Sequence, residues 1–476
     1  MEKRISSEVL LSYPGYDKRK VDDLLAAEVE ADARKIVVLD DDPTGIQTVH
    51  DISVYTDWSR ESIGRGFEEK NKMFFILTNS RGFTAEQTAK AHEEIGKQVD
   101  RTAKERGMEY LIVSRGDSTL RGHYPLETQL LRAVQEERNP WKVDGEILCP
   151  FFAEGGRFTI DNVHYVQYGS ELVPAGETEF AGDKTFGYHS SNLCGYIEEK
   201  TEGGFRADSV VCISLEDLRG MRLDEITKRL LAVKEFQKII VNAVDEYDIK
   251  VFCIALYRAM RKGKHYIFRT AAAFVKALGN ISDKPLLTRG ELITGAGRAA
   301  GMVVVGSHTE KTTMQLEELK KVAGLQFIEM NSDLVLVDGE LEREAERILT
   351  LCENGIRERR TVVVFTKRRR LTVENDTKEA ALLRSLRISE AVTSLVEKLE
   401  TAPDFIVAKG GITSSDIGTR ALRVKRAYVP GQICPGIPVW LTGEESKFPR
   451  LPYVIFPGNV GKVTALREAV ELLCLE

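Results

Sequence analysis

Short apolar runs that alternate with helical segments are the feature that most constrains how this chain can fold. The runs 36–39, 73–78 and 110–113 each have the length and character of a buried strand. The segment between the second and third runs has helical spacing and begins with the capping-box pair Thr84 and Gln87. Strands and helices that alternate in this way predict a mostly parallel α/β sheet, because parallel strands need a crossover connection.

The alternation continues along the chain, and at 476 residues the chain is too long for one compact core. Apolar strands are expected at 210–215 and 239–244, and a helix-prone run then reaches Leu278. A linker around Pro285 precedes a second series. In that series we expect strands at 302–307, 362–367 and 405–411 and helices at 315–322, 377–400 and 461–474.

We therefore predict an α/β protein of two domains, each a mostly parallel sheet flanked by helices, with the active site in the cleft between them. The predicted boundaries are a helical arm at 1–34, one α/β domain at 35–285 and a second at 286–476.

The composition excludes several classes of protein. A formal net charge of −6 argues against a nucleic-acid partner, and no stretch approaches the roughly 20 apolar residues that span a bilayer. The N-terminus lacks the pattern of a signal peptide. The seven cysteines are scattered singly, which is typical of buried free thiols in a reducing compartment. We expect a soluble cytoplasmic protein, and its oligomeric state stays open, a homo-oligomer included.

Three consecutive aspartates, Asp40, Asp41 and Asp42, follow the first predicted strand, and Thr44 and Gly45 come directly after them. Adjacent carboxylates repel each other unless a cation or a donor-rich ligand lies nearby. The turn is therefore a candidate site.

The ends of the next two strands add arginines and hydroxyl groups. Residues 78–81 include Arg81, and residues 114–121 include Arg115 and Arg121. Arginine binds carboxylates in a bidentate manner, and hydroxyl and amide groups can bind nearby alcohols. This set predicts a site for a small polyhydroxy acid. The alternative is that Arg115 and Arg121 form structural ion pairs with Asp41 or Asp117.

The same strand ends also fit a haloacid-dehalogenase-like phosphatase. In that interpretation Asp40 attacks phosphorus and Asp42 serves as the acid or base. The pattern needs a further carboxylate shortly after Gly116 and Asp117, and Arg121 stands there instead.

Glycine-containing turns follow three predicted strands of the second half, at 306–309, 409–415 and 457–461, and the loop 430–436 contains glycines as well. Glycine lets backbone N–H groups approach an anion closely. These turns predict a bound nucleotide. The basic run 367–370 is interpreted as a solvated strand end that could also steer an anionic nucleotide.

Several sequence blocks, in order, resemble the four-carbon acid sugar kinase family. They are DDDPTGIQTVH, SRGDSTLRGH, GRFTIDNVHYV, FRTAAAFVKALG, VVVGSHTEKTTMQLE, AKGGITSSDIG, PGQICPGIPVW and FPGNVGK. The resemblance runs from about Val37 to about Leu473. It implies that the N-terminal domain binds a sugar acid, that the C-terminal domain binds ATP, and that the reaction occurs in the cleft between them. Family members phosphorylate threonate, erythronate or 3-oxo-tetronate at a terminal hydroxyl.

The resemblance also assigns residues by position. On the substrate side it implies Asp41 or Asp42, Arg81, Arg115, Gly116, Asp117 and Ser118. On the nucleotide side it implies Ser307, Gly410, Gly411, Ile412, Thr413, Gly436, Gly458, Asn459, Val460 and Gly461. This chain differs from shorter family members at Pro43, where they usually have a hydrophobic residue, and at Arg115, where they have lysine.

Phosphoryl transfer depends mainly on alignment and charge neutralisation. We expect Arg81 and Arg115 to clamp the carboxylate of the sugar acid, and Asp41 or Asp42 to orient and deprotonate the attacking hydroxyl. ATP and Mg²⁺ are the expected cofactors. The remaining alternatives are the phosphatase and a non-catalytic sugar-acid sensor.

Overall fold

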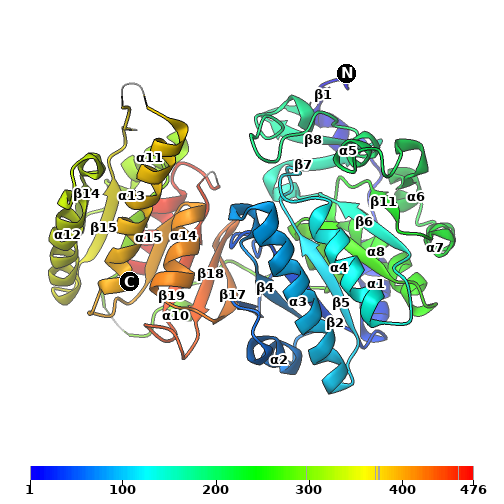
Figure 1. The fold of residues 1–476 in the computed structure, drawn as a ribbon, viewed down its shortest axis with the longest axis horizontal. Helices are drawn as coiled ribbons and strands as arrows, with labels where there is room; N and C mark the ends of the chain where they lie inside the picture. Colours follow the sequence, from blue (N-terminus) through cyan, green and yellow to red (C-terminus); the bar gives the residue numbers. More distant parts are fainter. Residues whose placement is uncertain (1, 296, 370, 374–375, 459, 475–476) are drawn as a thin grey trace. The chain divides into compact units, whose positions relative to one another are not determined.

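The computed structural model describes residues 2–295, 297–369, 371–373, 376–458 and 460–474 (Figure 1). The chain forms two compact units, and they are not simply its two halves. The first unit contains residues 1–49 and 57–283, and the second contains residues 50–56 and 284–476. Residues 50–56 had been expected in the first domain, but they belong to the second unit because they pair with one of its strands.

The first unit is built on a parallel sheet whose neighbouring strands follow the order β10-β11-β6-β12-β5-β2-β4. The strands β2, β4, β6 and β12 are buried along their whole length, as expected for a parallel sheet covered on both faces. The strand bounds are β2 (Lys35–Asp40), β4 (Met73–Leu77), β5 (Tyr110–Arg115), β6 (Gly145–Cys149), β10 (Val211–Ile213), β11 (Gln237–Val241) and β12 (Tyr266–Thr270).

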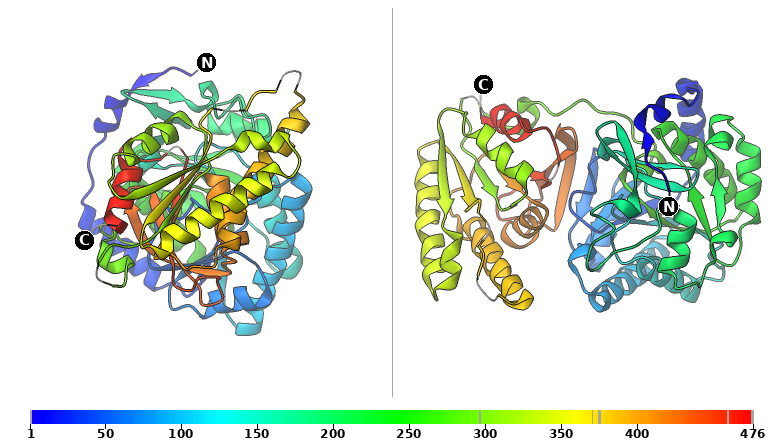
Figure 2. Two further views of the ribbon diagram at one scale, coloured as in Figure 1. Left: turned by 90° about the vertical axis from the view of Figure 1, so that its left-hand side faces the viewer. Right: turned by 90° about the horizontal axis from the view of Figure 1, so that it is seen from above.

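Helices cover both faces of this sheet (Figure 2). Helices α3 and α4 pack together on one face, and α1 and α8 pack together on the other. Helix α3 begins with the predicted capping box of Thr84 and Gln87. The bounds are α1 (Lys18–Glu30), α2 (Arg60–Glu68), α3 (Ala85–Arg106), α4 (Leu126–Arg138), α5 (Leu193–Lys200), α6 (Leu215–Arg219), α7 (Leu223–Ala232), α8 (Glu246–Arg261) and α9 (Ala272–Leu278).

Two segments of the first unit differ from the sequence prediction. Residues 1–34 are not a separate helical arm: β1 (Ile5–Ser6) pairs with β9 (Glu171–Pro174), and Glu28 of α1 accepts a hydrogen bond from Arg258 of α8. The helix-prone run ending at Leu278 contains strand β12, which lies between β5 and β6. A small antiparallel sheet in the order β1-β9-β8-β7, with β7 (Arg157–Ile160) and β8 (Val163–Tyr168), was not predicted.

The second unit contains a mixed sheet. Strands β19, β16, β13, β15 and β14 are parallel neighbours in that order, and β18, β17 and β3 continue from β19 as antiparallel strands. The strand bounds are β3 (Ile52–Tyr55), β13 (Met302–Val305), β14 (Leu325–Met330), β15 (Thr361–Thr366), β16 (Ile406–Lys409), β17 (Arg426–Cys434), β18 (Ile437–Thr442) and β19 (Pro452–Phe456).

Helices α12 and α13 pack together, as do α11 and α15, on the two faces of this second sheet (Figure 2). A buried core that includes Val303, Leu316, Phe405 and Leu466 joins α11 and α15 to the sheet. The helix bounds are α10 (Arg289–Leu292), α11 (Glu310–Leu319), α12 (Glu340–Arg357), α13 (Lys378–Lys398), α14 (Gly411–Asp416) with a π-helical turn (Ile417–Ala421), and α15 (Ala465–Cys474).

Candidate functional site

The parallel register of the first unit brings the predicted substrate residues to one edge of its sheet. Asp40 at the end of β2 lies opposite Leu77 of β4 and Arg115 of β5, and Arg115 lies opposite Thr270 of β12. The loops that follow these strands therefore start side by side. They carry Asp41, Asp42, Arg81, Gly116, Asp117 and Ser118.

The arginines of this cluster pair with the chain's own aspartates. Arg81 makes a bidentate contact with Asp41, with distances of 2.7 and 3.3 Å, and its Nη1 lies 3.3 Å from Asp42. Arg115 donates to Asp40 at 3.1 Å and lies 3.6 Å from Asp41. The side chain of Arg115 is 6% exposed and that of Arg81 is 22% exposed. Arg81 is therefore the better placed of the two to reach a ligand.

Asp40 is a buried structural residue in this arrangement. Its side chain is 2% exposed, and a Cβ atom added to Gly45 would lie 2.1 Å from its Oδ1. Burial, reinforced by the charges of Asp41 and Asp42 and opposed by Arg115, raises the pKa of Asp40 to about 7. A carboxyl group enclosed in this way has no open approach to a phosphorus atom. This geometry argues against the phosphatase interpretation, in which Asp40 is the nucleophile.

Asp42 is more accessible and is firmly oriented. Its side chain is 19% exposed, and its Oδ1 accepts hydrogen bonds from the backbone N–H of Thr44 at 2.8 Å and from the Thr44 hydroxyl at 2.5 Å. Burial opposes ionisation of Asp42, but Arg81 and these hydrogen bonds hold its pKa below the ordinary value. Asp42 is therefore a charged acceptor at the surface of the cluster.

Asp117 and Ser118 follow the neighbouring strand β5, and their polar groups are bound mainly by other residues of the chain. Asp117 accepts hydrogen bonds from Arg121, at 2.7 Å, and from Thr119. Burial opposes its ionisation, yet Arg81 and Arg121 hold its pKa well below the ordinary value. Ser118 is buried, and its carbonyl oxygen is 2.8 Å from Nε2 of His164. Arg121 thus forms the structural ion pair that the sequence left as an alternative.

Arg269 also belongs to this cluster, although its position in the sequence did not predict it. It donates to Glu127 at 2.6 Å and to the carbonyl oxygen of Arg121 at 3.1 Å. A Cβ atom on Gly116 would lie 2.2 Å from Cζ of Arg269, so glycine at this position makes room for the guanidinium. The sequence signal that could have indicated Arg269 is a charged residue inside the apolar run YIFRTAAAF, but this run was expected to be helical.

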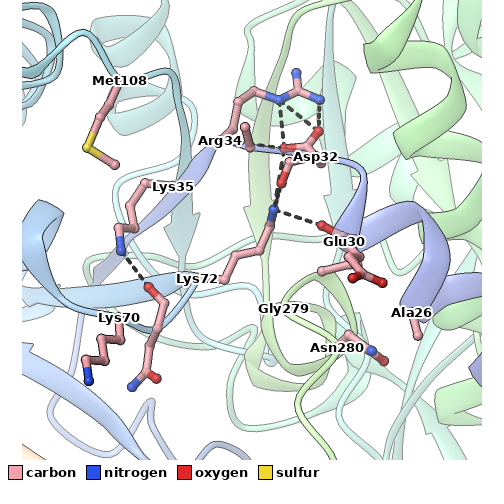
Figure 3. A pocket seen from close by; sticks show the side chains of 13 residues that line it. Ala26, Glu30, Asp32, Arg34, Lys35, Lys70, Lys72, Met108, Gly279 and Asn280 are labelled. Carbon is pink, nitrogen blue, oxygen red and sulfur yellow. Dashed lines mark hydrogen bonds and ion pairs between the residues drawn. The ribbon is translucent and has the colours of Figure 1, made fainter.

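A separate cavity of about 440 Å³ lies around the start of β2 (Figure 3). Lys35, the first residue of β2, donates to the carbonyl oxygens of Glu69 and Asn71 at 2.6 Å each. Lys72 donates to the carbonyl oxygen of Val29 at 3.0 Å and to that of Asp32. The aspartate cluster follows the opposite ends of the strands. Because these ammonium groups bind backbone carbonyls, we assign the cavity a structural role.

In the second unit, three loops that were predicted to bind nucleotide contact one another. The hydroxyls of Thr309 and Thr312 donate to the carbonyl oxygen of Gly458 at 3.2 and 3.1 Å, and that of Thr312 also donates to Ser307 Oγ at 3.0 Å. A Cβ atom on Gly410, where φ is +125°, would lie 3.1 Å from Cβ of Ser307. The loops after β13, β16 and β19 thus form one cluster.

The remaining residues predicted on the nucleotide side have different positions. Thr413 joins the cluster, because a Cβ atom on Gly306 would lie 2.2 Å from its Oγ1, and Gly436 lies against Val460, which a Cβ atom would approach to 2.9 Å. Gly411 and Ile412 begin α14, and Ile412 is 72% exposed. Gly461 has φ of +83° before α15. Asn459 lies outside the described residues.

Two basic residues complete this cluster. Lys409 at the end of β16 donates to the carbonyl oxygens of Pro457 and, at 3.1 Å, Gly458. Burial, followed by the charge of Lys311, lowers the pKa of Lys409 to about 7.

Arg368, which follows β15, donates to the carbonyl oxygen of Ser307 at 2.6 Å and to the Thr313 hydroxyl. Its Nη1 atom is buried and has no hydrogen-bond partner in the described part of the chain. Arg368 is therefore not the solvated strand end expected for residues 367–370, because its guanidinium is anchored to the loop after β13.

Comparison with known families identifies both units. The sugar-binding N-terminal domain model matches residues 36–278, and the nucleotide-binding C-terminal domain model matches residues 302–466. The chain belongs to the four-carbon acid sugar kinase family. The family match thus assigns sugar binding to the unit that carries the aspartate cluster, and nucleotide binding to the unit that carries the glycine loops.

Solved structures share the fold of this kinase-family chain. The Haemophilus influenzae protein HI1011 matches with a TM-score of 0.61 and 16% identity, over 92% of this chain and 100% of the other. A protein described as a putative tRNA synthase from Salmonella typhimurium LT2 matches with a TM-score of 0.63 and 14% identity, over 91% of this chain and 98% of the other. No curated protein sequence matches this chain significantly.

Within the described residues, no group of three or more His, Cys, Asp or Glu side chains is arranged to hold a metal ion. The helices of this part of the chain also include none with the length and apolar character needed to cross a bilayer.

Asp40 generates a testable pH dependence. Its pKa of about 7 in the folded chain exceeds the ordinary value of 3.8, so unfolding releases a proton between these values. This contribution to stability is fully present below about pH 4 and is lost as pH rises through about 7. As pH rises through that window, we expect the free energy of unfolding of Asp40→Asn to increase relative to that of the wild type, by up to about 1.4 kcal/mol per pH unit.

Urea unfolding from pH 4 to pH 8 would measure this difference. Asp208→Asn is the matched control, because Asp208 is 73% exposed and pairs with Arg206 at the surface. Parallel stability curves for the wild type and Asp40→Asn would contradict the raised pKa of Asp40.

Proposed function

We propose that this protein transfers the γ-phosphate of ATP to a hydroxyl of a small, four-carbon sugar acid. The observation that carries the proposal is the pairing, in one chain, of a sugar-binding family domain with a nucleotide-binding family domain. The first has an arginine and aspartate cluster at its strand ends, and the second has converging glycine loops. This combination supports the proposal, because a kinase needs a site for the acceptor and a site for the phosphates of the nucleotide.

On the nucleotide side, the loops supply donors for phosphate oxygens. Ser307 Oγ lies among Thr309, Thr312 and the position a Gly458 side chain would occupy, so the residues around it are small or hydroxylic. Arg368 has one guanidinium nitrogen free of internal partners among the described residues, while its other nitrogens hold it in place. A fixed guanidinium of this kind suits a phosphate group. We assign Arg368 to nucleotide binding.

Mg²⁺ is proposed to enter with the nucleotide, where it would neutralise phosphate charge. The described residues offer no protein-only cage for it, and a magnesium ion bound mainly by phosphates and water does not need one.

On the acceptor side, the structure favours Asp42 over Asp41 as the base. Asp41 is 3% exposed and its two oxygens are occupied by Arg81, whereas Asp42 is 19% exposed and is held by Thr44. We propose that Asp42 orients the attacking hydroxyl and accepts its proton, and that Arg81 binds the carboxylate of the acid. Arg115 then acts by holding Asp40 and Asp41 in place.

The function is tested by ADP release with a panel of four-carbon sugar acids and ATP, with p-nitrophenyl phosphate assayed alongside. A kinase releases ADP only when a suitable acid is present. Acid binding without ADP release would instead indicate a non-catalytic sensor, and phosphate release from p-nitrophenyl phosphate would indicate a phosphatase. Either of these results would overturn the kinase proposal.

Asp42→Asn tests the base. We expect kcat to fall by at least about 100-fold, because general base catalysis contributes a factor of that size or more, while ATP affinity stays unchanged. Asp208→Asn, at an exposed surface pair, is the control. Turnover of Asp42→Asn within a few-fold of the wild type would remove this residue from the base role.

Arg368→Met tests the nucleotide site. Hydrogen bonds to charged groups contribute about 1.5–3 kcal/mol, so we expect ATP affinity to fall by about 10- to 100-fold with binding of the sugar acid unchanged. The adjacent and exposed Arg369 offers a matched control, Arg369→Met. Calorimetric titration of both variants with ATP would measure the affinities. Equal ATP affinities of Arg368→Met and Arg369→Met would exclude a direct contact between Arg368 and the nucleotide.

A further inference from the structure

Two of the cysteines depart from the expectation of scattered, buried thiols. In the described structure Cys149, Cys253, Cys352, Cys434 and Cys474 are buried, whereas Cys194 and Cys212 are half-buried. The Sγ atoms of Cys194 and Cys212 lie 3.5 Å apart, although the residues are 18 positions apart in the sequence. Cys194 is near the start of helix α5, and Cys212 is in strand β10.

We propose that Cys194 and Cys212 are a disulfide-forming pair. A disulfide brings the two sulfur atoms to about 2.05 Å, and these atoms are already in contact before any bond forms. The partial exposure of both residues gives a small oxidant access that the five buried cysteines do not have. The inference does not depend on the proposed kinase activity.

Cys194 is the better nucleophile of the two. The two thiols share a hydrogen bond, and this contact holds the pKa of Cys194 below the ordinary value and raises the pKa of Cys212. Cys194 is the second residue of α5, and its backbone N–H donates to Oδ1 of the capping residue Asn192 at 3.0 Å, so it belongs to the first turn of the helix. A helix amino end favours a thiolate.

The reaction is a thiol–disulfide exchange with a small-molecule disulfide such as oxidised glutathione as the oxidant. The thiolate of Cys194 attacks one glutathione sulfur, forms a mixed disulfide and releases one glutathione thiolate. Cys212, after losing its proton, then attacks the sulfur of Cys194 and releases the second glutathione. The two protein thiols lose two electrons and two protons, and the glutathione disulfide is reduced to two thiols.

The pair is connected to the substrate-side cluster through helix α5. Tyr196 of α5 donates to the carbonyl oxygen of Leu120 at 3.0 Å and packs edge-to-face on Tyr188, which donates to the carbonyl oxygen of Thr119 at 2.9 Å. These hydrogen bonds support the loop that carries Asp117 and Arg121. A bond from Cys194 to Cys212 would fix α5 to the edge strand β10. Oxidation should therefore stabilise the position of α5, and with it the loop that carries Asp117 and Arg121.

The test uses the reduced full-length chain, incubated with oxidised glutathione and then alkylated. We expect the free-thiol titre to fall from seven to five, peptide mapping to find one crosslink between Cys194 and Cys212, and dithiothreitol to reverse the change. The melting temperature should rise on oxidation. Cys212→Ser should trap a single glutathionyl group on Cys194, whereas Cys194→Ser should form no internal crosslink.

Cys352→Ala is the matched control, because it removes a buried thiol of helix α12 and leaves the pair intact, so its crosslink should form as in the wild type. A thiol titre that stays at seven would overturn the proposal. So would a loss of thiols that maps mainly to the five buried cysteines. Both results come from the wild-type chain and do not require any variant to fold.

Discussion

Charge neutralisation at the ends of β2, β4 and β5 is the constraint on which the rest of the first unit depends. A parallel register brings Asp40, Asp41 and Asp42 to one edge of the sheet, where three buried or half-buried carboxylates would repel one another. Arg81 and Arg115, from the ends of the two neighbouring strands, offset this repulsion. Removing one partner from such a buried set leaves an uncompensated charge, which is strongly destabilising.

The two units hold their proposed ligand-binding groups in different ways. In the first, ionised side chains hold each other, so the cluster is rigid and few of its members are free to meet a substrate. In the second, Lys409 and Arg368 bind backbone carbonyl oxygens of neighbouring loops, which fixes the loops and leaves small residues and hydroxyls around Ser307.

Local patterns predicted much of the fold but less of the site. Apolar runs located β2, β4 and β5 within two residues, and the capping box marked the start of α3. The pattern failed at β12, because its short apolar run merges with the following helix α9 and contains Arg269. It also missed the pairing of β3 with β17, since two strands more than 370 residues apart share no local signal. Asp41 and Arg81 could be placed near each other because they lie in the loops that follow β2 and β4, whereas the contacts of Arg115 and Arg368 depend on partners that only the folded chain defines.

The assignment of β3 to the second unit has a practical consequence for dissecting the protein. The chain passes between the units three times, after residues 49, 56 and 283, so neither unit is one continuous segment. A fragment that begins at residue 284 would lack β3, the strand that pairs with β17. One edge of β17 would then present unpaired backbone groups to solvent. Isolated halves should therefore tend to aggregate, and a circular permutation or a graft of residues 50–56 offers a sounder route to a free-standing nucleotide unit.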